Sequence, residues 1–293
     1  MQVGDDRLIY LTHGVVPHWS SERISHALFV PEWLFVLHLQ QRCTKYVSLT
    51  QALAGEGDAL TIDDATHGGL RAARLALRYG HAVSWFVNGI HVERALPYFP
   101  FQISSMIDDT RQSDCRFEGR TWELQSSAAR RALRQYLKQL YMGMRGEEEI
   151  AQLVAAVSSS LGVDSAATEK ALRSVTSADL AAAAAAGIDL QNHSWRHLNP
   201  LLLSDSERTA EAALNEDYLS QFRKATTRAY APPFGEQVSL KSNVNDFVLL
   251  ADRSLASGHR KGNIVNRQDL LLNEFATMIA QMEQTPAHIL RAR

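Results

Sequence analysis

Two adjacent carboxylates follow a short apolar run in the stretch "ALTIDDATHGG". The run 59–62 predicts a buried strand, and the glycines at 68–69 predict the turn that follows it. At the end of a strand, Asp63 and Asp64 would repel each other. Such a pair is common in turns, and Asp64 could cap a helix that begins near residue 68. The other interpretation is that the two carboxylates take part in chemistry.

Two histidines spaced four residues apart form a second feature, in "NHSWRHL". His193 and His197 can face one point, on one helical turn or across a polar loop, although two unrelated surface or core histidines give the same pattern. Both the Asp pair and the His pair follow a predicted strand, so a parallel sheet would bring them to one edge. A carboxylate and two imidazoles suit Zn²⁺ or a similar divalent ion. One Asp would then bind the cation while the other stays free as a base.

Strand and helix patterns alternate along the chain, which predicts a parallel sheet covered by helices in a single α/β domain over 1–293. Before the middle of the chain, the predicted strands are 7–16, the start of 45–55, 59–62 and 81–89, and the predicted helices are 31–43 and 70–80. Residues 90–125 read as irregular, and 126–172 reads as a helical insertion or cap. Alternation then resumes, with Ser204 as the N-cap of a helix, a strand that breaks at Pro232, late strands, and a closing helix over 270–283.

The composition of the chain argues against several classes of protein, namely nucleic-acid-binding, membrane-spanning and secreted proteins. The 293 residues are 45% apolar and 21% charged, with a net charge of −2, so we expect a globular protein and no nucleic-acid partner. No run of eighteen apolar residues is present, so no membrane span is expected. The N-terminus lacks a signal-peptide pattern, and only Cys43 and Cys115 are present, far apart. These features favour a reducing compartment, and we expect a cytoplasmic protein.

Three motifs resemble those of the polysaccharide deacetylase family, the NodB-homology domain. The stretch "LTIDDATHGGLRAARLALRYGHAVSWFV" resembles its first motif, T-F-D-D-G, with the helix and apolar strand that follow. "NHSWRH" resembles the second motif, H-[ST]-x-x-H, and "APPFG" at 231–235 resembles the third, R-x-P-[YF]-G. The resemblance covers roughly 7–89 and 173–240, and the helical segment between them has no counterpart in compact family members.

The resemblance implies a distorted (β/α) barrel with fewer than eight strands and removal of acetyl groups from amino sugars. It assigns metal binding to Asp64, His193 and His197, with Zn²⁺ expected and Co, Ni or Mn as alternatives. Asp63 becomes the general base that accepts a proton from water, because a divalent cation polarises the amide carbonyl and lowers the pKa of water. A backbone N–H near Phe234 would help to hold the oxyanion.

Departures from the family pattern open further questions. Ile62 and Ala65 replace the usual Phe and Gly of the first motif, which looks tolerable. Ala231 occupies the position of the third-motif arginine that normally orients the base. Arg228 lies on the same predicted strand, but we favour Arg267 as the substitute, because a residue at the end of a late strand can point into the site; a solvated surface arginine is the alternative.

Three further assignments complete the predicted site. The late family histidine has no clean match, so His259 is a candidate general acid or a surface-loop residue. His13, at the end of the first strand, could line the site or be a satisfied strand-end residue. We assign substrate binding to His13, Pro233 and Trp195.

These residues predict a metal-dependent N-deacetylase acting on a small acylated amine or amino sugar. Loss of the third-motif arginine and of the late histidine favours an alternative, a non-catalytic binding protein on the same fold. A third possibility is hydrolysis of a non-sugar amide, such as a formamide. The apolar stripes of 126–172 could cover the active site or join two subunits of a homo-oligomer.

Overall fold

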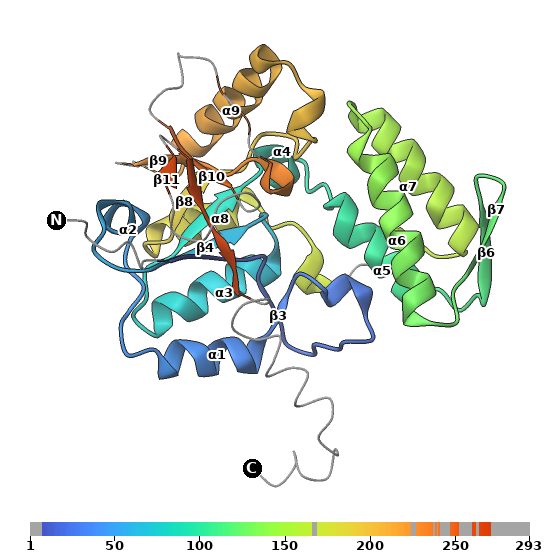
Figure 1. Ribbon diagram of the computed structural model, residues 1–293, viewed down its shortest axis with the longest axis horizontal. Coiled ribbons are helices and arrows are strands. Elements are labelled where there is room, and N and C mark those ends of the chain that lie inside the picture. Colours follow the sequence, from blue (N-terminus) through green and yellow to red (C-terminus); the bar gives the residue numbers. More distant parts are fainter. Residues whose placement is uncertain are drawn as a thin grey trace, which may run out of the picture.

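The protein has a mixed α/β fold with a central, mostly parallel sheet, as the alternating pattern predicts (Figure 1). The computed structural model describes residues 8–165, 169–223, 227–236, 238, 240, 247–251, 260–261 and 264–270. The strands are β1 (Ile9–Thr12), β2 (Val15–Val16), β3 (Val30–Pro31), β4 (Ala59–Asp63), β5 (Ser84–Val87), β6 (Asp114–Phe117), β7 (Arg120–Glu123), β8 (Asp189–Asn192), β9 (Arg228–Tyr230), β10 (Phe247–Ala251), β11 (Arg260–Lys261), β12 (Ile264–Asn266) and β13 (Gln268–Asp269). The α-helices are α1 (Glu32–Gln41), α2 (Leu49–Ala54), α3 (His67–Arg78), α4 (Gly89–Glu93), α5 (Phe99–Asp109), α6 (Ser127–Met142), α7 (Glu147–Leu161), α8 (Ser177–Ala185) and α9 (Asp205–Ser220).

The order of strands in the main sheet is β11-β12-β10-β9-β8-β5-β4-β1-β13. Neighbouring strands are parallel except for β11 and β12. The stretch 264–269 pairs with β10 through its first half and with β1 through its second half. One short segment therefore pairs with both β10 and β1, which lie toward opposite ends of the strand order, as a barrel requires at its seam, while complete closure stays a prediction.

Local sequence signals explain most element boundaries. The Ser204 hydroxyl accepts a hydrogen bond from the Glu207 backbone N–H, which confirms Ser204 as the N-cap of α9. Strands β4 and β5 are buried along their whole length, as expected for parallel strands covered on both faces.

Some predicted elements differ from the structure. The start of 45–55 forms no strand; Ser48 caps α2 instead, through a capping box with Gln51. Residues 90–125 are not irregular, since they form α4, α5 and the β6–β7 hairpin. The closing helix predicted over 270–283 lies outside the described residues, apart from Leu270.

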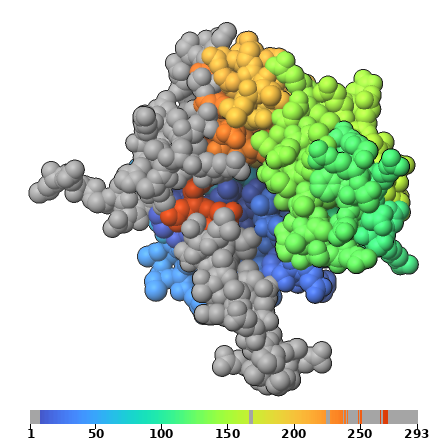
Figure 2. Space-filling view, turned by 45° about the vertical axis from the view of Figure 1, so that its right-hand side comes forward, coloured from blue at the N-terminus to red at the C-terminus, as the bar shows by residue number. Residues whose placement is uncertain are grey.

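A second apolar core lies beside the sheet, in residues 99–161, here called the α5–α7 unit. It includes Ile103 and Ile107 of α5, Leu133 and Leu137 of α6, and Val157 of α7. Helices α6 and α7 of the helical segment predicted at 126–172 therefore share a core with α5, whereas Leu172 at the end of that segment packs in the main core. Figures 1 and 2 show α6 and α7, with the β6–β7 hairpin, gathered on one side of the molecule. Within the described ranges, no helix is both long and apolar enough to cross a membrane.

The glycines at 68–69 do not form the predicted turn. They lie in the first turn of α3, where the chain at Gly14 packs directly against them. A Cβ built on Gly14 would lie 2.4 Å from the Gly69 nitrogen, and Gly14 has a φ of +130°. These glycines permit a close backbone contact between the end of β1 and the helix that follows the Asp pair.

We expect Gly14→Ala to lower the free energy of unfolding by about 2–4 kcal/mol, because the side chain meets rigid backbone at an unfavourable φ. Urea unfolding followed by circular dichroism measures this. Gly146→Ala is the matched control, since a Cβ there meets nothing within 4 Å. Equal unfolding free energies for the two variants would contradict the close-contact explanation.

Candidate metal centre

The parallel strands bring the predicted site residues to one edge of the sheet. Asp63 ends β4 and Asp64 follows it, while His193 directly follows β8, the second strand along from β4. Ala231 directly follows β9, and Arg267 stands between β12 and β13. Residues far apart in the sequence therefore meet at the carboxyl ends of the strands, where sites in parallel sheets form.

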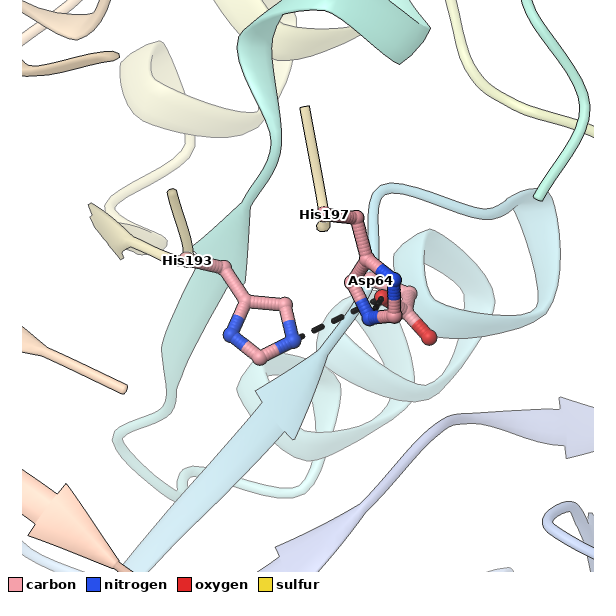
Figure 3. A group of neighbouring side chains, drawn as sticks. All are labelled: Asp64, His193 and His197. Carbon is pink, nitrogen blue, oxygen red and sulfur yellow. Dashed lines mark ion pairs between the residues drawn. The ribbon is translucent and has the colours of Figure 1, made fainter. Parts of the chain in front are cut away.

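The three predicted metal ligands lie together (Figure 3). Nε2 of His193 is 3.6 Å and Nε2 of His197 is 3.4 Å from Oδ1 of Asp64. In a tetrahedral site with bonds near 2.1 Å, ligand atoms lie roughly 3.4 Å apart. The ligand atoms of all three residues fall within 4.8 Å of one another, and the three side chains are buried.

The surroundings of Asp64 test whether a cation fits. Oδ1 of Asp64 is buried and has no hydrogen-bond partner. Burial, and next the Asp63 carboxylate, raise the pKa of Asp64 well above its usual range. A divalent cation would supply both the missing partner and the missing positive charge, so the residues present fit such an ion.

A hydrogen bond at Nδ1 of His193 leaves the other ring nitrogen, Nε2, available toward Asp64. Nδ1 of His193 lies 2.7 Å from the Ala231 carbonyl oxygen. Because a carbonyl only accepts, Nδ1 carries the hydrogen and Nε2 keeps its lone pair. Burial lowers the pKa of His193, and lowers that of His197 well below its usual value, so both rings are neutral ligands at neutral pH.

Asp63 has a different partner, the guanidinium of Arg267. Two parallel hydrogen bonds of 2.7 Å join Arg267 to the two carboxylate oxygens, and both side chains are buried. Burial alone would raise the pKa of Asp63, but the charge and the hydrogen bonds of Arg267 bring it below its usual value. The pKa values of the two adjacent carboxyls are thereby shifted in opposite directions. Asp63 is favoured as the ionised form, whereas Asp64 would be ionised only beside a bound cation.

Backbone strain is concentrated at this site. Asp64, Ser194, His197 and Phe234 all have positive φ, between 54° and 73°. Only two other non-glycine residues within the described ranges share that conformation. Each such residue costs about 1–3 kcal/mol, so the surrounding contacts must hold the ligand loops firmly.

One buried hydrogen-bond chain links the two ligand loops. The Tyr98 hydroxyl accepts from the Ala65 backbone N–H at 2.7 Å and donates to Oδ1 of Asn88 at 2.9 Å. The Asn88 amide in turn donates to the carbonyls of His193 and Ser194. His91 stacks on Tyr98 at 4.0 Å, and burial lowers its pKa to about 4.

Helix α9 anchors the histidine loop from the other side. The Glu211 carboxylate, 3% exposed, accepts from the backbone N–H of Arg196 at 2.9 Å and from its Nε at 2.7 Å. The Asn215 side chain donates to Oδ1 of Asn192 at 2.9 Å and accepts from Gly89 N–H at 2.7 Å. The sequence analysis did not identify Glu211 and Asn215. Their only signal in the sequence is that they are polar residues on the face of α9 that is buried.

The third motif borders the ligands. The Phe234 ring lies edge-on to His197, with centroids 5.0 Å apart, and Pro233 is buried beside it in a short 3₁₀ turn, Pro233–Gly235. His13 lies partly exposed at the end of β1, edge-on to Phe101, and its charge contributes to lowering the pKa of Asp63.

Two other predicted positions, Trp195 and Arg228, make their described contacts with residues other than the three ligands, and a third falls outside the described residues. The Trp195 ring packs against Gly89 and Tyr218, between α4 and α9, so its described contacts are structural. Arg228 is half exposed and lies 3.5 Å from Glu216, which leaves Arg267 as the arginine paired with Asp63. His259 lies outside the described residues.

Comparison with known proteins supports the family resemblance. Residues 163–248 match the family described as polysaccharide deacetylase, and this range contains both histidines and the third motif. The predicted resemblance to that family is thus confirmed, and the match supports a deacetylase. No curated protein sequence matches at a significant level.

Two solved structures share the fold. The Streptococcus pyogenes deacetylase PplD, solved in complex with acetate, aligns over 94% of this chain and 96% of its own, with 16% identity and a TM-score of 0.56. IcaB from Ammonifex degensii aligns over 96% of this chain and 98% of its own, with 15% identity and a TM-score of 0.55. At these identities the likeness establishes the mixed α/β fold.

We expect Asp64→Asn to abolish stabilisation by Zn²⁺ and to raise the stability of EDTA-treated protein at pH 8 by about 1–3 kcal/mol. The folded state holds the Asp64 proton more tightly than the unfolded state, so the stability of EDTA-treated wild type falls as pH rises above the unfolded pKa. The amide has no charge to desolvate and removes this pH dependence. Urea unfolding with EDTA or Zn²⁺ measures both effects.

The control for this change is Asp217→Asn, which alters an exposed carboxylate on α9. It is expected to leave the response to Zn²⁺ unchanged. A wild-type response to Zn²⁺ in Asp64→Asn would contradict the ligand assignment.

We expect Arg267→Met to move the acidic limb of the kcat/KM profile to higher pH. Without the guanidinium, burial raises the pKa of Asp63, and activity that needs ionised Asp63 is lost at a higher pH as acid is added. A pH–rate profile measures this, with Arg228→Met as the matched control. An unchanged acidic limb would show that Arg267 does not tune Asp63.

Proposed function

We propose that the protein is a metal-dependent hydrolase that removes an N-acyl group, most simply acetyl, from an amino sugar or another small acylated amine. One observation carries the proposal: Asp63, paired with Arg267, stands beside a buried Asp-His-His cluster in which Oδ1 of Asp64 has no hydrogen-bond partner. This arrangement combines a cation site with a base that the cation does not neutralise.

Asp64, His193 and His197 would hold the ion. When bound, a divalent cation supplies Lewis acidity toward an amide carbonyl and toward water. Three protein ligands leave positions open, which is the pattern of catalytic rather than structural zinc sites. The ligand chemistry suits Zn²⁺, and Co, Ni and Mn remain alternatives.

Asp63 would act as the general base. Its Oδ2 lies 3.8 Å from Nε2 of His193, so the carboxylate borders the ligand cluster. The fork of Arg267 fixes the carboxylate plane by binding both oxygens, and it keeps the group ionised while it is buried. Asp63 is therefore ready to accept a proton from an attacking water molecule.

Arg267 takes the role that the third-motif arginine has in the family. At position 231 this chain has a buried alanine whose carbonyl oxygen orients His193. The guanidinium reaches Asp63 from the seam between β12 and β13 instead of from β9. This replacement removes one of the two reasons for considering a non-catalytic binding protein.

The third motif and the first strand would shape the substrate pocket. Phe234 is held in a left-handed conformation next to His197, and its backbone N–H is our candidate for stabilising the oxyanion. Pro233 and the partly exposed His13 border the same region and are proposed to contact the substrate.

We expect Asp63→Asn to lower kcat by about 10²–10⁴-fold while Zn²⁺ still binds, because the base is lost and the ligands are kept. The assay follows release of acetate or formate from a panel of N-acetyl and N-formyl amines, which also separates deacetylation from deformylation. Asp58→Asn breaks another aspartate–arginine pair, with Arg42, and serves as the control for general destabilisation. Full turnover by Asp63→Asn would contradict the proposed role.

A further inference from the structure

The C-terminal end of α6 and the turn that follows it are joined to the loop that carries His197. The joining contacts are hydrogen bonds from Tyr141 Oη to the His197 carbonyl (2.8 Å), from Asn199 Nδ2 to the Met142 carbonyl (2.9 Å), and from Arg145 to the Leu202 carbonyl. The α5–α7 unit therefore touches the backbone of a metal ligand directly.

The hydroxyl of Tyr141 contacts His197 twice. It donates its one proton to the His197 carbonyl, and it lies 3.3 Å from Nδ1 of the same residue. With its proton committed, the oxygen can only accept from Nδ1–H. That tautomer leaves the lone pair on Nε2, which faces Asp64 at 3.4 Å.

The two ligand histidines are thus held in the same way by different groups. His193 donates from Nδ1 to a backbone carbonyl of the sheet domain, whereas His197 donates to a side chain of the α5–α7 unit. His197 also has a positive φ of 54° and lies outside any helix or strand, so its carbonyl is not part of a secondary-structure ladder. Tyr141 satisfies that carbonyl as well as the ring.

Packing surrounds the ring of Tyr141, and its hydroxyl makes the hydrogen bonds to His197. One face of the ring stacks on Phe99, with centroids 4.4 Å apart and planes at 12°. The ring also borders a cavity of about 760 Å³ between the α5–α7 unit and α4, lined in part by Leu198 and Val154. The ring is also edge-on to Phe234, with centroids 5.9 Å apart, and it is only 4% exposed, so packing holds the ring in place and the hydroxyl makes the two contacts with His197.

We propose that Tyr141 is a positioning residue for His197, so that the α5–α7 unit completes the metal centre in addition to flanking it. This inference rests on the proposed function, since it concerns the affinity of the same site for its cation. A hydrogen-bonded partner of a ligand histidine fixes ring orientation, and its loss weakens metal binding by about 10- to 100-fold.

The test is the Zn²⁺ affinity of Tyr141→Phe, measured by competition with a chromophoric chelator. We expect affinity to fall by about 10- to 100-fold. In the Co²⁺-loaded protein, we expect the visible absorption bands to shift, because the orientation of one imidazole is no longer fixed. Phe keeps the ring and its stack on Phe99, so the variant is expected to fold, which thermal unfolding in EDTA checks.

Two controls separate ligand orientation from general loosening. Tyr136→Phe removes another hydroxyl of α6, which donates to Glu118, and is expected to leave Zn²⁺ affinity unchanged. Asn199→Ala breaks the neighbouring bond to Met142 without touching the His197 ring, so it is expected to lower the unfolding temperature while keeping Zn²⁺ affinity close to wild type.

Wild-type affinity and unshifted Co²⁺ bands in Tyr141→Phe would overturn the inference while leaving the proposed function intact. An equal loss of affinity in Asn199→Ala would also overturn it, because docking of the unit would then be the cause. A wild-type protein that binds neither Zn²⁺ nor Co²⁺ would instead overturn the proposed function, and this inference with it.

Discussion

The buried ion pair between Asp63 and Arg267 is the interaction on which the rest of the site depends. Two neighbouring carboxylates in a buried environment cannot both ionise without compensation. Arg267 compensates one of them through both oxygens, and the other keeps an unpartnered oxygen facing two neutral imidazoles. One fixed positive charge therefore distinguishes two chemically identical side chains, which suits them to the separate roles proposed above, a base and a cation ligand.

The loops that carry Asp64, His193 and His197 have strained backbone, and hydrogen bonds from several parts of the fold hold them in place. Asn88 and Tyr98 connect the carboxylate loop to the histidine loop inside the sheet domain, and Glu211 holds the histidine loop from α9. Tyr141 adds a contact from a unit with its own apolar core. The candidate metal centre is therefore supported by two packing units.

The sequence predicts the parts of this arrangement that depend on local pattern. Alternating strand and helix periodicity predicts the parallel sheet, and paired Asp and His residues at strand ends predict the ligand cluster. The position of Arg267 at the end of a late strand was sufficient to favour it over Arg228. The remaining features depend on tertiary contacts. Tyr141 lies in an amphipathic helix, where a tyrosine ordinarily indicates core packing. The glycines at 68–69 were predicted to form a turn, but their small size instead permits the close contact with Gly14. No local pattern encodes such contacts.

The segment that carries Arg267 between β12 and β13 also constrains how the protein is made. Asp63 and Arg267 are 204 residues apart, so their pair forms only after nearly the whole described chain has been synthesised. Until then Asp63 at the end of β4 lacks its guanidinium, and β1 lacks its neighbour β13. Until the segment 264–269 has been synthesised, the two aspartates lack the guanidinium that compensates one of them, which favours late burial of this edge of the sheet.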